Sequence, residues 1–228
     1  GHVTGVQTCA LPILGAEIIN DPTGLTYEPD LVKAVVEHDA GLIINHMRGK
    51  PETWTKLGPM KDPLGTISTE LGAAMHRAVL AGVDKKRIVV DPGLGFGKRK
   101  EQNAEILALL GRLSGLTLPI LVGPSRKHFV AKESEDQTEF ATAAAVTAAV
   151  FGGAHLVRVH DVVAMKAVVE VADQIVVVAD EVEREIAEKK ADKRKSKPAP
   201  DSASQDEKPE GFAPFKRRTT TEVVKEEQ

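Results

Sequence analysis

The stretch Ile88–Lys98, with the sequence IVVDPGLGFGK, joins an apolar run to a carboxylate, a glycine-dense loop and a lysine. Apolar β-branched residues in succession are typical of a buried strand, and Asp91 stands where that strand should end. The alternate glycines Gly93, Gly95 and Gly97 allow backbone N–H groups to approach a ligand closely. The loop matches neither the G-x-G-x-x-G pattern of dinucleotide-binding folds nor the Gly-Lys-Ser/Thr ending of a P-loop. It therefore predicts a strand with a different small-molecule site at its carboxyl end.

Short apolar runs alternate with helix-like segments on both sides of this stretch. We expect strands at residues 17–20, 41–46, 87–91, 119–123 and 155–159, and helices near residues 29–39, 64–82, 102–112, 139–152 and 162–173. The strands lack polar alternation, as parallel strands covered on both faces do. The run Ile175–Val178 is either a further strand or the end of the last helix. This alternation predicts a parallel α/β fold.

The number of units favours one parallel fold. Five units of about 32 residues fit a (β/α)8 TIM barrel, since eight such units need about 250 residues. The chain would then hold the last five β/α units. A flavodoxin-like open sheet would place one phosphate loop early, whereas polar residues here follow all five strands. That recurrence favours the barrel, whose active site lies at the carboxyl ends of the strands.

The strand ends supply candidate binding groups. Asn20 offers a donor and an acceptor, which suits the edge of a heterocycle, although a turn or helix cap is the simpler interpretation. Lys127, after the fourth strand, could hold an anion or a carbonyl group. Arg158 and His160 share one face of the fifth strand, where both could bind one anion. His46 is a general base or a packed ring, and we favour packing.

Composition excludes several classes of function. A net charge of −3 and an aromatic content of 4% disfavour nucleic-acid binding. The apolar runs are far shorter than the ~18 residues of a membrane helix, so no membrane partner is expected. The single cysteine, Cys9, cannot form an internal disulfide, which favours a cytoplasmic location. The sequence has no Cys/His cluster, H-E-x-x-H or G-x-S-x-G, so it indicates neither a metal site of usual spacing nor a nucleophilic mechanism.

The two ends of the chain differ from the middle. Residues 1–14 resemble the translation of a sequencing adapter, and we expect this segment to be non-native. Residues 181–228 form a charged tail, rich in Pro, Ser, Lys and Glu towards its end, that we expect to be disordered. The barrel domain would then occupy residues 15–180.

Together the motifs resemble the dihydropteroate synthases, which are pterin-binding barrels. The resemblance rests on IIND at 18–21, NHMRG at 45–49, DPGLGFGK at 91–98, SRK at 125–127 and RVHD at 158–161. It implies a TIM barrel that condenses 6-hydroxymethyl-7,8-dihydropterin diphosphate with 4-aminobenzoate. The products are 7,8-dihydropteroate and pyrophosphate, in a step of folate synthesis that sulfonamides target. It also implies Mg²⁺ and a homodimer.

The resemblance assigns roles to individual residues. It implies a pterin site of Asn20, Met47, Asp91, Phe96, Gly123 and Lys127. It implies an aminobenzoate site of Phe96, Ser125, Arg126 and Lys127, and a diphosphate site of Arg158 and His160. Lys127, Arg158 and His160 would be the catalytic groups.

The sequence departs from the family pattern at its start. Three earlier strands are absent, with the asparagine that binds metal and diphosphate, a flexible loop and a pterin-binding aspartate. We therefore expect no metal ligand in this chain. An incomplete barrel exposes sheet edges and apolar surface, so we expect the chain as written to be unstable and inactive. Measurable dihydropteroate formation by the purified chain would contradict that expectation.

Three other functions stay open. The nearest is a methyltetrahydrofolate:corrinoid methyltransferase, although the cations Lys127, Arg158 and His160 favour a reaction with an anionic leaving group. The second is a non-enzymatic pterin-binding paralogue. The third is an interaction protein that acts through the tail.

Overall fold

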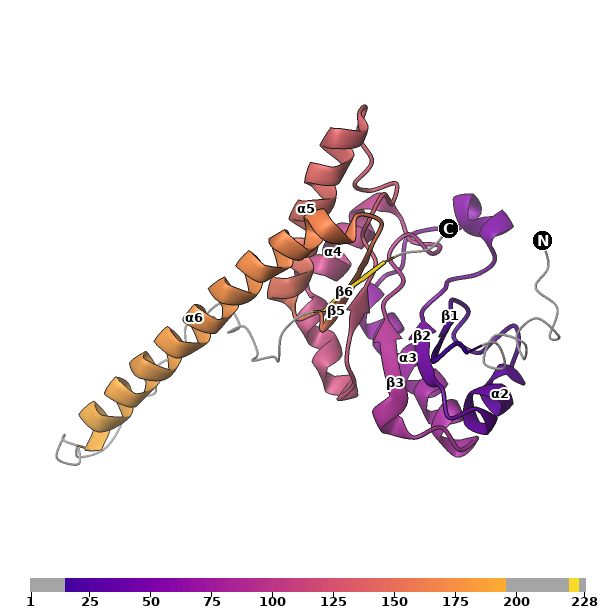
Figure 1. Cartoon of the computed structure of the whole chain (residues 1–228), viewed down its shortest axis with the longest axis horizontal. Helices are drawn as coiled ribbons and strands as arrows, with labels where there is room; N and C mark the ends of the chain where they lie inside the picture. The colour runs from indigo at the N-terminus through magenta and orange to yellow at the C-terminus, as the bar shows by residue number, and fades with distance from the viewer. Residues whose placement is uncertain (1–14, 196–221, 226–228) are drawn as a thin grey trace.

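The computed structural model describes residues 15–195 and 222–225 of the 228-residue chain. Its parallel strands form two three-stranded sheets (Figure 1), one of β1 (Ile18–Asp21), β2 (Gly41–Asn45) and β3 (Ile88–Asp91), the other of β4 (Leu121–Val122), β5 (Leu156–Val159) and β6 (Glu222–Lys225). A parallel bridge between Val90 and Ile120 links β3 to the segment that enters β4. The strands therefore succeed one another in chain order, with all their carboxyl ends on one side.

Helices connect the strands. They are α2 (Leu31–Glu37), α3 (Pro63–Leu80), α4 (Lys100–Ala108), α5 (Glu135–Gly152) and α6 (Val162–Lys195), with short 3-10 helices η1 (Pro51–Lys56), η2 (Lys85–Arg87) and η3 (Leu110–Leu116). Each of the strands β1 to β5 is followed by an α-helix. The predicted β/α alternation is thus confirmed, and the five expected strands lie close to their expected bounds.

Local signals in the sequence begin the two helices of 18 residues. Asp62 caps α3 through a hydrogen bond from the N–H of Gly65 to its carboxylate, 3.1 Å long, and Pro63 occupies the first helical position. Ser134 caps α5 in the same way by accepting from the N–H of Gln137 at 3.2 Å. Both arrangements satisfy N–H groups that have no partner within the helix.

The core lies between the sheet and the helices. Leu42 and Ile44 of β2 pair with Ile88 and Val90 of β3, and all four are fully buried. Each such side chain stabilises the fold by about 1.5–3 kcal/mol when it is buried. The opposite face of the sheet is more open, since Ile18 of β1 keeps 60% of its surface exposed. This open face carries the candidate site.

Helix α6 is longer than the sequence analysis expected. It runs through residues 175–178, which excludes a strand there, and passes the expected boundary at Asp180 to end at Lys195. Ala, Glu, Lys and Arg are strong helix formers, and Lys189 pairs with Glu185 one turn away at 3.3 Å. Figure 1 shows the second half of α6 projecting from the body. A charge-rich sequence was therefore a poor indicator of disorder between residues 181 and 195.

Strand β6 was also not expected. It pairs in parallel with β5, with Arg158 opposite Val224. Residues 1–14, which we expect to be non-native, and residues 196–221 and 226–228 of the predicted tail lie outside the described residues. Within the described part, no helix has both the length and the hydropathy to cross a membrane.

Candidate active site

The carboxyl ends of β1, β2 and β3 bring three polar side chains to the open face. The register pairs Asn20 with Ile43, and Asn45 with Asp91. Residues two apart on a strand share a face, so Asn20, Asn45 and Asp91 all lie opposite the helix-covered core. Asn20 is exposed, whereas Asn45 and Asp91 are each 1% exposed. Sequence analysis named Asn20 and Asp91 but assigned no role to Asn45, although its place at a strand end was visible.

The guanidinium of Arg158 joins this group from β5. Its Nη2 lies 3.1 Å from Asp91 Oδ2, and its Nη1 donates to Asn20 Oδ1 at 3.4 Å. The Arg158 and Asp91 side chains are 13% and 1% exposed, so this ion pair is largely removed from water. Gly123 at the end of β4 leaves room for it, because a Cβ there would lie 2.9 Å from Nη2. The structure thus brings four sequence-predicted residues together.

Opposing effects act on the Asp91 carboxyl group. Burial raises the pKa of Asp91, while Arg158, the N–H of Gly93 and the amines of Lys98 and Lys127 favour the charged form. The Gly93 N–H donates to Oδ1 at 2.7 Å, and Arg158 occupies Oδ2. The carboxylate is therefore fixed in orientation, because Oδ1 accepts from the glycine loop and Oδ2 accepts from Arg158 of β5.

Lys98 ties the glycine loop to the end of β2. Its buried amine donates to the carbonyl oxygens of His46, Gly93 and Phe96 at 2.9, 2.7 and 3.2 Å. Burial lowers the pKa of Lys98 to about 7, against the opposing charges of Asp91 and Glu70. Sequence analysis noted this lysine at the end of the loop but gave it no place in the site.

The loop after β3 requires glycine at two of its positions. Gly93 and Gly97 have φ values of 67° and 70°, in the left-handed region that favours glycine. A Cβ at Gly93 would lie 2.0 Å from the carbonyl oxygen of His46, and one at Gly97 would lie 2.2 Å from that of Arg48. The glycines thus allow the close packing of the loops after β2 and β3.

Phe96 stands between a cation and a second aromatic ring. The amine of Lys127 lies 4.9 Å from the centre of the Phe96 ring. On η1, Trp54 packs edge-on against the same ring, with centroids 5.6 Å apart and planes at 73°. The pairing of Phe96 with Lys127 agrees with their shared predicted role. Trp54 was missed, because nothing in the sequence marks a contact across 42 residues.

Ser125 orients His160. The Ser125 hydroxyl lies 2.8 Å from His160 Nδ1 and also accepts from the backbone N–H of His160 at 3.3 Å. If the hydroxyl donates a hydrogen bond to Nδ1, the ring proton resides on Nε2, which can then donate to an anion. Ser125 is buried, so it acts here through His160.

Arg126 and Met47 make contacts other than the Asp91–Arg158 ion pair. The Arg126 side chain pairs with Glu139 of α5 at 2.8 Å, and this hydrogen bond raises the pKa of Arg126. Met47 lines a pocket of about 210 Å³ together with Asn45 and with residues of the β1–α2 loop and of α3, including Glu70. Met47 therefore shares a pocket with one member of the strand-end group, whereas the Arg126 side chain is paired with α5.

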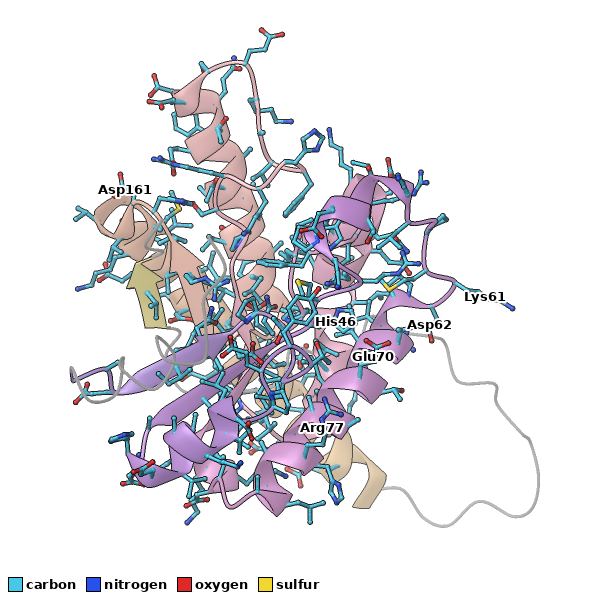
Figure 2. All side chains as sticks on the ribbon, turned by 90° about the vertical axis from the view of Figure 1, so that its right-hand side faces the viewer. His46, Lys61, Asp62, Glu70, Arg77 and Asp161 are labelled. Carbon is cyan, nitrogen blue, oxygen red and sulfur yellow. The ribbon has the colours of Figure 1, made fainter. Side chains whose placement is uncertain are left out.

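His46 is a packed ring. It is 3% exposed, and burial lowers the pKa of His46 to about 3, with Lys98 and Arg48 adding to the effect. Its Nε2 lies 3.0 Å from a carboxylate oxygen of Glu70 on α3 (Figure 2). That contact lacks hydrogen-bond geometry, so neither ring nitrogen has a hydrogen-bond partner among the described residues. A buried ring with a pKa this low is a weak base, which supports packing over general-base catalysis.

The described residues do not build a complete metal site. No group of three or more His, Cys, Asp and Glu side chains converges within residues 15–195 and 222–225.

The sequence matches the family described as pterin binding enzyme over residues 4–160. It is 40% identical over 165 residues to a dihydropteroate synthase of Synechocystis, covering 71% of this chain and 57% of that protein. It is 35% identical over 153 residues to the Escherichia coli K12 enzyme, covering 65% and 54%. The chain thus spans little more than half the length of these relatives.

Solved structures give the same result. The dihydropteroate synthase of Yersinia pestis, solved with a sulfonamide drug, superposes with a TM-score of 0.71 at 29% identity over 76% of this chain and 64% of that one. The Thermus thermophilus enzyme, in complex with 6HMPPP, gives 0.70 at 31% identity over 76% and 70%. The parallel α/β fold is therefore that of part of a TIM barrel. The chain belongs to the pterin-binding enzyme family.

Proposed function

We propose that this chain forms the substrate-binding face of a dihydropteroate synthase. The reaction joins 6-hydroxymethyl-7,8-dihydropterin diphosphate to 4-aminobenzoate and releases pyrophosphate. The observation that carries the proposal is the convergence of Asn20, Asp91 and Arg158 at the strand ends. This group combines a heterocycle-binding edge with a cation for the diphosphate.

Ligands in related structures support these substrates. The Thermus thermophilus enzyme was solved with 6HMPPP. A Xanthomonas albilineans enzyme, at 32% identity and a TM-score of 0.67, was solved with 4-aminobenzoic acid, and another structure of it with 7,8-dihydropteroate. We transfer these ligand classes to this chain as small-molecule partners.

The pterin would bind at the carboxyl ends of β1 to β4. Asn20 offers a donor and an acceptor to the ring edge, and Asp91 accepts from ring N–H groups. Phe96 and Lys127 would form the wall shared with aminobenzoate. Gly123 leaves the space that Arg158 occupies. Met47 and Arg126 keep their proposed roles in the pterin and aminobenzoate sites only if a ligand or loop rearrangement brings them closer.

Arg158 and His160 would serve the leaving group. The amine of aminobenzoate attacks the methylene carbon of the pterin, the carbon–oxygen bond breaks, and pyrophosphate leaves with the bonding electrons. The attacking amine loses one proton. Negative charge grows on the pyrophosphate, where a guanidinium and an imidazole N–H stabilise it. Ser125 holds the imidazole in place for this task.

Lys127 and Asp91 would act at the other end of the reacting bond. Asp91 favours positive charge that develops on the pterin as the bond breaks. Lys127, held over Phe96, can donate to the pterin ring and hold the aminobenzoate wall. Orientation of the two substrates supplies much of the remaining rate enhancement, and no covalent enzyme intermediate is needed. Mg²⁺, a homodimer and a cytoplasmic location remain predictions that rest on the resemblance and the composition.

Binding and turnover should be measured separately on the 228-residue chain. Titration with the dihydropterin diphosphate, followed by calorimetry, should give saturable binding that Arg158→Gln and Asp91→Asn each weaken at least about tenfold. Circular dichroism of each variant checks that the fold is retained. A folded chain that does not bind the diphosphate would refute the proposal. Pyrophosphate release in the presence of aminobenzoate distinguishes an enzyme from a pterin-binding protein.

A further inference from the structure

Trp54 is the single tryptophan of the chain, and it is the residue through which η1 contacts the Phe96 ring. Its indole packs against Phe96 at 5.6 Å in a T-shaped arrangement. The backbone at Gly97 approaches it closely, since a Cβ there would lie 3.0 Å from the Trp54 Cδ1 atom. The indole is therefore confined by the same glycine loop that carries Phe96.

The second partner of the Phe96 ring is Lys127. The Lys127 stem crosses Gly95, where a Cβ would lie 3.4 Å from its Cδ atom. Its amine then reaches 4.9 Å from the ring centre, within the range of a cation–π contact. Trp54, Phe96 and Lys127 thus form a continuous series of contacts that begins on η1 and ends in the loop between β4 and α5.

The segment that carries Trp54 is itself anchored. Arg48 donates from its side chain to the carbonyl of Gly58, and Thr53 donates to the carbonyl of Lys50 at 2.8 Å. The backbone N–H of Arg48 donates to the carbonyl of Phe96 at 3.3 Å. These hydrogen bonds fix η1, and with it the backbone of Trp54, relative to the glycine loop.

We propose that Trp54 is a positioning residue that sets the Phe96 ring, and through it the Lys127 amine, for the aminobenzoate side of the site. This inference rests on the proposed function. Without the indole, the Phe96 ring loses its edge contact and can rotate away from the cation. The aminobenzoate site then loses its wall, while the Asp91–Arg158 group that would hold the pterin diphosphate keeps its own contacts.

The test compares two ligands on three variants of the full chain. Trp54→Leu should weaken 4-aminobenzoate binding by about tenfold, the size expected for a lost aromatic pair. Binding of the dihydropterin diphosphate should stay within about twofold on the same scale. Trp54→Phe, which restores an aromatic partner, should recover most of the loss. Tyr27→Leu is the matched control, because Tyr27, in the β1–α2 loop, also contacts a lysine, namely Lys50 at the N-cap of η1, 5.9 Å from the ring centre.

The outcomes separate the inference from the proposed function. If wild type binds both ligands and Trp54→Leu binds each of them as tightly as wild type does, the inference is wrong and the proposed function stands. Equal weakening of both ligands, or no recovery in Trp54→Phe, would mean a general structural role and would also overturn it. If wild type binds neither ligand while folded, both proposals fall.

Discussion

At the scale of single residues, His46 shows how burial changes chemistry next to a candidate site. Its ring lies at a strand end, as a general base would, but it points towards Glu70 of α3 and is buried from solvent. The side chains that face it are Glu70, Lys98 and Arg48. A ring in such a place is neutral in the folded chain, and that state has a consequence for stability in acid.

We expect His46 to make folding sensitive to acid. Its pKa is about 3 in the folded chain and about 6.5 ordinarily, so the unfolded chain takes up the proton first as the pH falls. The stabilising contribution is complete above about pH 6.5 and is lost towards pH 3, at about 1.4 kcal/mol per pH unit. Urea unfolding of wild type and His46→Phe between pH 7 and pH 4.5 measures the difference. Parallel stability curves for the two proteins would contradict this assignment.

Gly123 should control the position of Arg158. In Gly123→Ala, the new Cβ would meet Nη2 at 2.9 Å and the two neighbouring guanidinium atoms at 3.3 Å. The guanidinium must then move away from Asp91, and we expect binding of the dihydropterin diphosphate to weaken about tenfold or more. Gly115→Ala is the control, since a Cβ there meets nothing within 4 Å. Calorimetric titration of both variants decides the matter, and unchanged affinity in Gly123→Ala would show that the pair tolerates the shift.

At the scale of elements, the loops after β2 and β3 behave as one unit because Lys98 joins them. Three carbonyl oxygens share one amine, and two glycines allow the backbones to touch. Leu94 anchors the loop after β3 in the core, where it is 1% exposed. The Lys98 amine adds a second connection, which joins this loop to the end of β2.

Replacing Lys98 should loosen both loops at once. Lys98→Met keeps a similar apolar stem but leaves the carbonyls of His46, Gly93 and Phe96 without this donor. The Gly93 and Phe96 carbonyls keep their backbone donors, the N–H groups of Phe96 and Arg48, so the His46 carbonyl is the group that loses its partner. We expect the free energy of unfolding to fall by about 1–3 kcal/mol, the cost of one unpaired buried group. Urea unfolding at pH 6 measures the loss. Lys100→Met, on the exposed first turn of α4, is the control and should change stability little.

The sequence predicted elements better than contacts. The five strands followed from runs such as Ile88–Asp91, where residue type, length and the next glycine all agree. The roles of Lys98 and Trp54 were missed because each contacts a residue far away in the sequence. Lys98 binds the carbonyl of His46, and Trp54 packs on Phe96, and no local sequence pattern indicates such contacts. Arg158 and Asp91 were both identified as site residues, but with different ligands. Only the three-dimensional structure shows that their side chains contact each other.

At the scale of the whole molecule, the C-terminal elements β6 and α6 were the ones that the sequence predicted least well. The outer edge of β5 is covered by β6, which comes from a segment that composition alone marks as a tail. Helix α6 likewise continues to Lys195 although its last turns are almost entirely charged. In both cases polar composition concealed regular structure, because backbone pairing and helix propensity do not require an apolar sequence.

Removing residues 196–228 should uncover β5 while leaving α6 in place. Backbone groups of β5 that β6 now pairs would face solvent, so amide hydrogen exchange in β5 should become faster. Mass spectrometry of exchanged peptides can compare this strand with β2, which lies between β1 and β3 and should not change. Equal protection of β5 in both chains would mean that β6 contributes nothing to the edge.

The contact between Arg158 and Asp91 also bears on how a reaction cycle would end. A compound that carries both a pterin ring and a diphosphate can compensate each member of the pair for its lost partner. In the proposed reaction, the product no longer carries the diphosphate and would bind only Asp91. The Arg158 guanidinium, 3.1 Å from Asp91 in this structure, would then compete with the product for the carboxylate. Re-formation of the ion pair would favour release of dihydropteroate and weaken product inhibition.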